Sequence, residues 1–295
     1  MKKSAIIGIS GGIDSSWAVQ KAVESGLFDI TLFTFENGWE TLIAESNIRK
    51  LVNYYGFPHI TKSVPSETFH NIQAAFLNAS TPDAECPSDL AIKAYLLDTA
   101  QTFNADVIIT GANAETEGRM PAEWSMIDYR YLKDVCRRFG VNTKGFPRFN
   151  ILDTLKYKKL CYNILDGTNY TPDDAKQKLA SLYGWEDYGT KHGENVYTRF
   201  IKALRFYKFG IDTRVIEFRA KVDAGLMTWD DLINWLSVPA CPPEQFILDW
   251  FLVEKRLGVR RDEIMALPIK SYRNYKTYRT HPAVRIAKAI KGLFR

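Results

Sequence analysis

Short apolar runs alternate with helical periodicity along the first hundred residues of the chain. A short apolar run between turn residues is typical of a buried strand, and apolar positions three and four apart are typical of a helix that covers it. The expected strands are residues 5–9, 30–35, 59–64 and 107–110. The expected helices are residues 15–25, 41–55, 66–78 and 88–103, and each begins on a Ser or Thr that suits a helix N-terminus. This alternation predicts an α/β fold, a parallel sheet with helices on both faces.

Beyond about residue 144 the pattern changes to helices joined by aromatic-rich connections. Thr171 followed by Pro172, and Thr228 followed by Asp231, are helix-start signals. Helical periodicity also covers residues 196–207, 213–224 and 244–257. Because Gly and Pro interrupt the pattern near residues 140–147, we expect an α/β domain at residues 1–145. A mainly α-helical region that binds substrate or a partner is expected at residues 146–295.

The composition is that of an ordinary compact soluble protein, with 295 residues, 46% of them hydrophobic, and a net charge of +5. It excludes disordered, collagen-like and fibrous classes. The four cysteines form no CxxC pair and the four histidines show no metal-ligand spacing, so no zinc site is expected. With no apolar run of membrane-spanning length and no signal-peptide pattern, we expect a cytoplasmic protein with reduced thiols.

The first expected strand runs directly into Ser-Gly-Gly-Ile-Asp-Ser-Ser at residues 10–16, which a helix follows. Glycines let the backbone turn sharply and approach a ligand, and the amides at a helix start point at an anion. Asp14 can hold Mg²⁺ against phosphate oxygens. The stretch is neither a Walker A motif nor a GxGxxG motif. It predicts a pyrophosphate cradle, and the alternative is a tight turn in which Asp14 or Ser15 only caps the helix.

This motif resembles the signature of the PP-loop (N-type) ATP pyrophosphatases, an adenine nucleotide alpha hydrolase-like group. The resemblance implies that ATP is cleaved between its α and β phosphates with Mg²⁺, giving an adenylated substrate and pyrophosphate. It makes Asp14 the metal ligand, Asp14 and Ser15 catalytic, and the backbone around Phe33 and Phe35 the adenine edge. The residues that it assigns to the nucleotide are Ser10, Gly11, Gly12, Asp14, Ser15, Ser16, Phe33, Phe35, Gly111 and Asn113.

A narrower resemblance covers nearly the whole chain and is carried by residues 35–39, 75–83, 110–121, 128–134, 183–192, 198–200 and 265–272. These stretches look like the N-acetyl sugar amidotransferases of bacterial surface-glycan (lipopolysaccharide O-antigen) biosynthesis. That resemblance implies an ATP-dependent amidotransferase that forms a C–N bond. It would adenylate the acetamido group of a nucleotide-linked sugar, and ammonia would then replace oxygen to give an acetamidino sugar.

Several charged or aromatic residues are candidates for contacts with substrate. Glu117, Arg130 and Lys133 are candidates for phosphate or metal contacts, with Lys133 also a catalytic candidate, and the alternative is solvated charge near a helix start. His192 and Arg199 are candidates for the sugar diphosphate. Trp39 is a candidate for stacking on a sugar or base, and the alternative is a core aromatic at the start of a helix.

No pattern of a glutaminase nucleophile is present, so ammonia is expected from free ammonium or, preferably, from a separate glutaminase subunit. All charged residues after Glu263 are basic, and Val284, Ala287, Ile290 and Leu293 form an apolar stripe. Such a tail fits a helix on anionic lipid at the inner membrane face, a helix on RNA, or a packed terminal helix. A homodimer through the helical region also stays open.

Two other functions remain as alternatives. One is a tRNA-modifying PP-loop enzyme that adenylates a base and then transfers sulfur or an amine. Sulfur delivery usually needs paired reactive cysteines, and the four scattered cysteines show no such spacing. The other alternative is a non-catalytic nucleotide-binding protein that retains the loop.

Overall fold

The computed structural model describes residues 1–118, 120–121, 124–168, 171–189, 193–268, 277–284 and 286. Within them, five parallel strands form one sheet in the order β3-β2-β1-β4-β5. The strands are β1 (Lys3–Gly8), β2 (Phe28–Glu36), β3 (His59–Ser63), β4 (Val107–Thr110) and β5 (Cys161–Asn163). The four predicted strands are confirmed, whereas β5 was not predicted because three residues are too few to show a periodicity.

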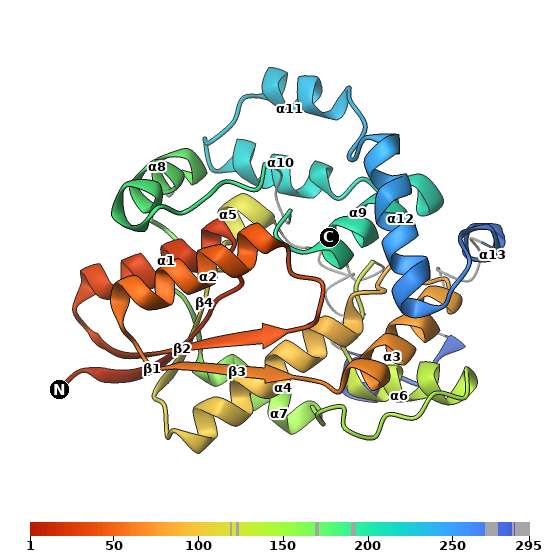
Figure 1. Cartoon of the computed structure of the whole chain (residues 1–295), viewed down its shortest axis with the longest axis horizontal. Coiled ribbons are helices and arrows are strands. Elements are labelled where there is room, and N and C mark those ends of the chain that lie inside the picture. The colour runs from red at the N-terminus through yellow and green to blue at the C-terminus, as the bar shows by residue number, and fades with distance from the viewer. Residues whose placement is uncertain are drawn as a thin grey trace.

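The sheet is buried on both faces because alternate strand residues enter two different cores. Ile6, Phe33 and Ile108 belong to the larger core, and Ile7 and Leu32 belong to the other. Figure 1 shows helices on either side of the sheet. The helices of this part of the chain are α1 (Ile13–Ser25), α2 (Leu42–Tyr55), α3 (Ser66–Asn78), α4 (Cys86–Thr102), α5 (Ala114–Glu117), α6 (Tyr129–Arg138) and α7 (Ile151–Leu160).

The order of the strands places a crevice at one end of the sheet. The chain moves outward from β1 through β2 to β3 and then returns to β4 on the other side of β1. The loops that follow β1 and β4 therefore diverge at the carboxyl edge, the position where open α/β sheets bind ligands. Residues 9–12 and 111–113 are these two loops.

The second half of the chain is mainly helical, as expected. Its helices are α8 (Pro172–Tyr183), α9 (Val196–Phe209), α10 (Arg214–Asp223), α11 (Trp229–Leu236), α12 (Pro243–Leu257) and α13 (Arg261–Ala266). The side chain of Thr171 accepts from the Asp174 amide and Thr228 forms a capping box with Asp231, so both predicted caps are present, as is that of Thr41 on α2. The predicted starts on Ser15, Ser66 and Ser88 are wrong as caps, because Gly12, Pro65 and Glu85 hold the N-cap positions of α1, α3 and α4. The sheet draws β5 from beyond residue 145. The division into residues 1–145 and 146–295 stays a prediction.

Helix α12 is fixed to α9 by aromatic packing and by one ion pair. The ring of Phe200 lies 4.7 Å from that of Trp250, edge to face. Beside them Arg199 donates to both carboxylate oxygens of Asp249 at 2.9 and 2.7 Å, and Asp249 has no exposed surface. A fully buried carboxylate depends on its partner, so this pair ties the two helices together.

The described part of the C-terminal tail packs on α6. The backbone amides of Arg279 and His281 donate to Asp134 and Asp128 at 2.9 and 2.6 Å. The ring of Tyr278 packs edge to face on Tyr131, 5.4 Å away. Of the predicted apolar stripe only Val284 is described, and it packs against the core. Ala287, Ile290, Leu293 and most of the basic residues lie outside the described residues.

We expect Arg199→Leu to lower the free energy of unfolding by about 3 kcal/mol, because it leaves the buried Asp249 carboxylate without its cation. Urea denaturation measures the change. Adding Asp249→Leu to the variant removes the stranded charge and should recover part of the loss. A single variant as stable as the wild type, or a double variant less stable than the single one, would contradict this role of the pair.

Candidate active site

The loop after β1 contains a glycine that no other residue can replace. Gly11 has φ of 77°, and a Cβ there would lie 2.3 Å from the carbonyl oxygen of Ala44 on α2. Both the backbone conformation and the lack of space therefore require glycine. Its carbonyl oxygen accepts from Asn47 Nδ2 at 3.2 Å and from Trp185 Nε1 at 3.3 Å. The turn of the loop is thus fixed by α2 and by the segment after α8.

The loop after β4 touches the same place from the other side. A Cβ on Gly111 would lie 2.6 Å from both the carbonyl carbon of Asp14 and the amide nitrogen of Ser15. Backbone therefore packs on backbone where the two loops meet at the start of α1. This contact confirms that the strand order brings the two loops together.

Hydroxyl groups close the loop on itself. Ser15 Oγ accepts from the Ser10 amide at 3.1 Å and donates to the Gly12 carbonyl oxygen at 3.1 Å. Gly12 donates its own amide to Ser10 Oγ at 3.4 Å. The first amides of α1 have no partner within the helix, so the closed loop presents them as an anion site.

One of these amides is already engaged by a tyrosine. The Ile13 amide donates to Tyr188 Oη at 3.0 Å. Burial, with the charges of Glu194 and Asp14 acting in the same direction, raises the pKa of Tyr188, so the phenol keeps its proton. Tyr188 therefore accepts from the loop and still carries a hydrogen that it can donate.

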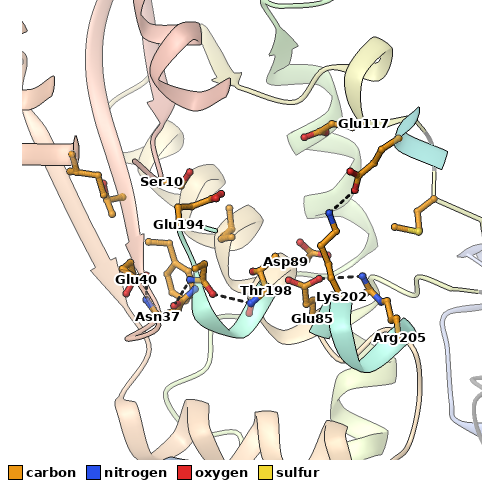
Figure 2. A pocket seen from close by; sticks show the side chains of 18 of the residues that line it. Ser10, Asn37, Glu40, Glu85, Asp89, Glu117, Glu194, Thr198, Lys202 and Arg205 are labelled. Carbon is orange, nitrogen blue, oxygen red and sulfur yellow. Dashed lines mark hydrogen bonds and ion pairs between the residues drawn. The ribbon is translucent and has the colours of Figure 1, made fainter. Parts of the chain in front are cut away.

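Two cavities meet at this loop. The smaller, about 230 Å³, is lined by the loop and by residues that close over it: Ser10, Gly12, Ile13, Asp14, Ser15, Gly111, Glu117, Tyr188 and Glu194. The larger, about 410 Å³, shares Ser10, Glu117 and Glu194 with it and continues between α4, α9 and α10. Figure 2 shows Ser10 and Glu194 at one end of the larger cavity and Lys202 and Arg205 at the other. The two cavities form one site with three residues at the junction.

The larger cavity is strongly acidic. The two cations among the described residues of its lining are already paired, since Lys202 donates to Glu217 at 2.7 Å and Arg205 lies 3.4 Å from Glu85. Arg205 also donates to the Pro82 carbonyl oxygen at 2.6 Å. The carboxylates that line the cavity are Glu40, Glu85, Asp89, Glu117, Glu194 and Glu217. The excess of carboxylates favours cationic or neutral groups over polyanions.

Glu85 stands out among these carboxylates. It precedes the first residue of α4, with Asp89 one helical turn further on. Burial raises the pKa of the Glu85 carboxyl, and the nearby Asp89 charge acts in the same direction, although the Arg205 guanidinium opposes them. A carboxylate with a raised pKa holds and releases protons nearer neutral pH than an ordinary one.

The structure brings together most of the predicted loop residues. Gly11 supports the turn, Phe35 lines the larger cavity, and Glu117 lines both cavities. The other predicted residues at the smaller cavity are Ser10, Gly12, Asp14, Ser15 and Gly111. Whether they bind nucleotide stays a prediction.

Besides Gly11, which supports the turn, three residues predicted for the nucleotide do not line either cavity. Ser16 is fully buried on the inner face of α1, and its amide donates to the Gly12 carbonyl oxygen. Phe33 is a core residue whose carbonyl oxygen accepts from the Ile9 amide within the sheet. Asn113 is buried and accepts from the Glu115 amide at 2.9 Å, so it caps α5 instead.

Trp39 does not stack on a ligand, because its side chain is only 1% exposed. Its indole nitrogen donates to Gln73 Oε1 at 3.1 Å, and its ring packs on Tyr197 at 5.3 Å. The Arg256 guanidinium covers the ring at 4.7 Å. The alternative interpretation, a core aromatic at a helix entry, is therefore the one that the structure supports.

The predicted basic residues of α6 and α9 also lie away from both cavities. Arg130 and Lys133 are on the exposed side of α6, whose other side buries Tyr131 and Leu132. Arg199 is engaged with Asp249 as described above. His192 lies outside the described residues.

The sequence analysis missed the residues that close the site. Tyr188 lies within a stretch that was singled out for its resemblance, but its contact with Ile13 has no sequence signal. Lys202 and Glu217 are on different helices, so no spacing relates them. Asn47 was detectable as a polar residue on the buried face of α2, beside Ala44 and Ile48.

Among the described residues, no group of three His, Cys, Asp or Glu side chains is arranged to hold a metal ion by itself. Mg²⁺ that accompanies a nucleotide is held largely by phosphate oxygens and water, so a single carboxylate suffices. Asp14, at the base of the smaller cavity, fits that role. None of the helices in the described part of the chain has the length and apolarity needed to span a bilayer.

Comparison with known proteins finds relatives that are similar to only part of the chain. No family model matches the chain. It is similar to tRNA-specific 2-thiouridylase MnmA 2 of Geobacillus kaustophilus, with 30% identity over 135 residues, which are 41% of this chain and 36% of the relative. MnmA of Enterococcus faecalis is 29% identical over 129 residues, covering 39% and 34%. The chain thus spans about a third of the length of the curated relatives that it matches.

The sequence identity to solved structures is lower. U34-tRNA thiolase NcsA from Methanococcus maripaludis has 13% identity and a TM-score of 0.39, covering 77% of this chain and 74% of that one. NMN synthetase from Francisella tularensis has 15% identity and a TM-score of 0.34, covering 88% of each.

These comparisons support the coarser of the predictions. The fold is the predicted α/β architecture, a parallel sheet with helices on both faces followed by a mainly helical region. The curated relatives are named as tRNA-specific 2-thiouridylases, and these names fit the tRNA-modifying alternative better than the sugar amidotransferase interpretation. The sugar amidotransferase resemblance is not shown by these matches.

We expect Gly11→Ala to abolish ATP binding, because the added methyl group collides with backbone of α2 as well as straining φ. Gly26→Ala is the matched control, since Gly26 has φ of 65° and nothing within 4 Å of the added carbon. It should cost about 1 kcal/mol of stability and leave ATP binding unchanged. Calorimetric titration measures the affinity of both variants for Mg-ATP. Equal affinities would contradict the assignment of this loop to ATP.

Proposed function

We propose that this protein is an ATP-dependent amidotransferase of the PP-loop class, which adenylates a carboxamide oxygen and then replaces that oxygen by ammonia. The observation that carries the proposal is the junction of the two cavities at Ser10, Glu117 and Glu194. A loop suited to pyrophosphate lies on one side of the junction, and an acidic chamber of small-molecule size lies on the other. The α-phosphate of ATP would react at the boundary between them.

The chemistry has two balanced steps. In the first, the amide oxygen attacks the α-phosphorus, the bond to the β-phosphate oxygen breaks, and pyrophosphate leaves as the amide N–H proton is lost. In the second, ammonia adds to the imidate carbon, AMP leaves with the oxygen, and a proton is released to give the amidine. The protein must neutralise pyrophosphate and align the reactants, and a covalent protein intermediate is unnecessary.

The chamber's charge supports ammonia as the second substrate. Its carboxylates attract ammonium, and a base is then needed to release ammonia. Glu85 is suited to this role because its pKa is raised by burial. Ammonia from a separate glutaminase subunit would meet the same chamber. An uncharged acetamido group enters such a chamber more favourably than a phosphate group does, so the diphosphate of a nucleotide-linked sugar would lie outside the chamber.

The placement of the cysteines supports nitrogen transfer over sulfur transfer. Among the described residues that line the two cavities there is no cysteine, and the half-buried Cys161 on β5 is therefore outside both linings. Cys86, Cys136 and Cys241 are buried, and burial raises the pKa of each thiol, to about 12 for Cys136 and about 11 for Cys241. Such thiols are poor nucleophiles near neutral pH.

A second candidate is adenylation of a tRNA base followed by amine transfer. The names of the curated relatives favour it. Those matches cover about two fifths of this chain, so most of the chain lies outside the similarity. Contact with RNA or with a membrane through the basic tail also remains a proposal.

The test of function is release of AMP and pyrophosphate from Mg-ATP with ammonium, in parallel with nucleotide-linked acetamido sugars and with unmodified tRNA. We expect turnover that depends on the sugar and yields a product lighter by the difference between oxygen and NH. Asp14→Ala should reduce it by at least about 10²-fold. Turnover with tRNA alone would establish the second candidate, and binding of ATP without turnover in either series, with glutaminase or free ammonium, would contradict an enzymatic role.

We expect Glu85→Gln to lower kcat/KM for ammonium by about 10²-fold and to leave the KM for ATP unchanged. The wild-type rate, divided by the fraction of free ammonia at each pH, should change through the raised pKa of Glu85, because the ionised carboxylate is the base, and this change should be absent in the variant. Initial rates with ammonium from pH 5 to 8 measure it. Glu67→Gln, an exposed carboxylate on α3, is the control. Identical pH profiles for wild type and Glu85→Gln would exclude the role.

A further inference from the structure

Helix α12 is apolar on two opposite sides. Phe246, Trp250 and Val253 are buried against the rest of the protein. On the solvent side, four large apolar residues are 37–64% exposed: Ile247, Leu248, Phe251 and Leu252. Their spacing of one, three and four residues places them on a single face of the helix. A surface helix needs only one apolar stripe, so the second one marks a surface that is covered in the functional state.

The surroundings of this stripe extend the exposed apolar surface. Helix α11, joined to α12 by residues 237–242, exposes Trp229, Ile233 and Trp235 by 52–62%. Figure 1 shows α11 and α12 at the outer edge of the molecule, on the far side from β1 and β2. Helix α12 has 15 residues and is about 22 Å long, enough to form the centre of an interface.

Two charges flank the stripe symmetrically. Glu244 lies three residues before Ile247, and Lys255 lies three residues after Leu252, on the same face of the helix. Both are exposed, and neither forms an ion pair within the described part of the chain.

The other charges of α12 already have partners. Asp249 is bound to Arg199, and Glu254 accepts from the Arg261 amide at 2.6 Å. Arg256 covers the ring of Trp39 and donates to the Gly38 carbonyl oxygen. Glu244 and Lys255 are thus the charges of this helix that stay available to a partner.

We propose that a second copy of this chain covers the stripe, with the two α12 helices antiparallel about a two-fold axis. With the axis midway between residues 249 and 250, Ile247 faces the partner's Leu252, and Leu248 faces the partner's Phe251. Glu244 then faces the partner's Lys255 at both ends of the contact. The charge pattern is complementary to itself only in this antiparallel arrangement, because a parallel pair would bring like charges together.

The test is the oligomeric state of the full chain, measured by sedimentation equilibrium over a range of concentrations. We expect the wild type to be a dimer and Leu248→Asp to be a monomer. Leu155→Asp is the matched control, since Leu155 on α7 is 58% exposed and outside the stripe, and it should stay dimeric. Circular dichroism and Mg-ATP binding must be unchanged in each variant, which separates loss of the dimer from loss of the fold.

Charge reversal tests the orientation. Glu244→Lys or Lys255→Glu alone puts like charges opposite each other and should raise the dimer dissociation constant at least about tenfold. The two together restore opposite charges and should return it to near the wild-type value. Three results would overturn the proposal: a wild type that is monomeric at every concentration, a dimer unaffected by Leu248→Asp, or a double reversal that dimerises more weakly than either single variant. A monomeric wild type would leave the stripe to a different protein, such as a glutaminase.

Discussion

Backbone-to-backbone contact at two glycines is the constraint on which the site depends. The strand order brings the ends of β1 and β4 side by side, but at the two contact points only a residue without a side chain fits. Gly11 touches α2, and Gly111 touches the start of α1. Because neither loop can move away without breaking a strand end, the helix amides that face the smaller cavity are held in place by the sheet itself. Because the loop is rigid here, its amides are already oriented for an anion before one binds.

The acidic chamber is assembled differently from the loop. Its walls come from the start of α4 and from α9 and α10, whose lining residues follow those of α4 by more than a hundred residues of chain. They are held by ion pairs between helices, such as Lys202 with Glu217 and Arg205 with Glu85. The helical half therefore does more than cover the sheet: it completes the site, and in the proposed reaction it provides the ammonia side while the sheet provides the nucleotide side.

The predictability of these features follows from how local their causes are. Four of the five strands and the caps at Thr41, Thr171 and Thr228 could be predicted because apolar runs and capping residues act over a few neighbouring positions. The loop could be predicted too, since its chemistry lies in consecutive residues. Strand β5 could not, because only its pairing with β4 defines it. Trp39 looks the same in sequence whether it stacks on a ligand or fills a core, and its burial depends on Tyr197 and Arg256 from distant helices. The exposed position of Lys133 could have been predicted, since Tyr131, Leu132 and Val135 fix which side of α6 is buried.

The docking of the tail on α6 has a consequence for how the chain matures. Asp134 and Asp128 receive their donors from residues 145 and 153 positions later in the sequence. During synthesis, Arg137, Arg138 and the Arg130 amide reach these two carboxylates long before the tail amides do. Closing so long a loop is also slow compared with helix formation. The packing of Tyr278 and Val284 on this side of the larger core is therefore added last, after translation has passed these residues.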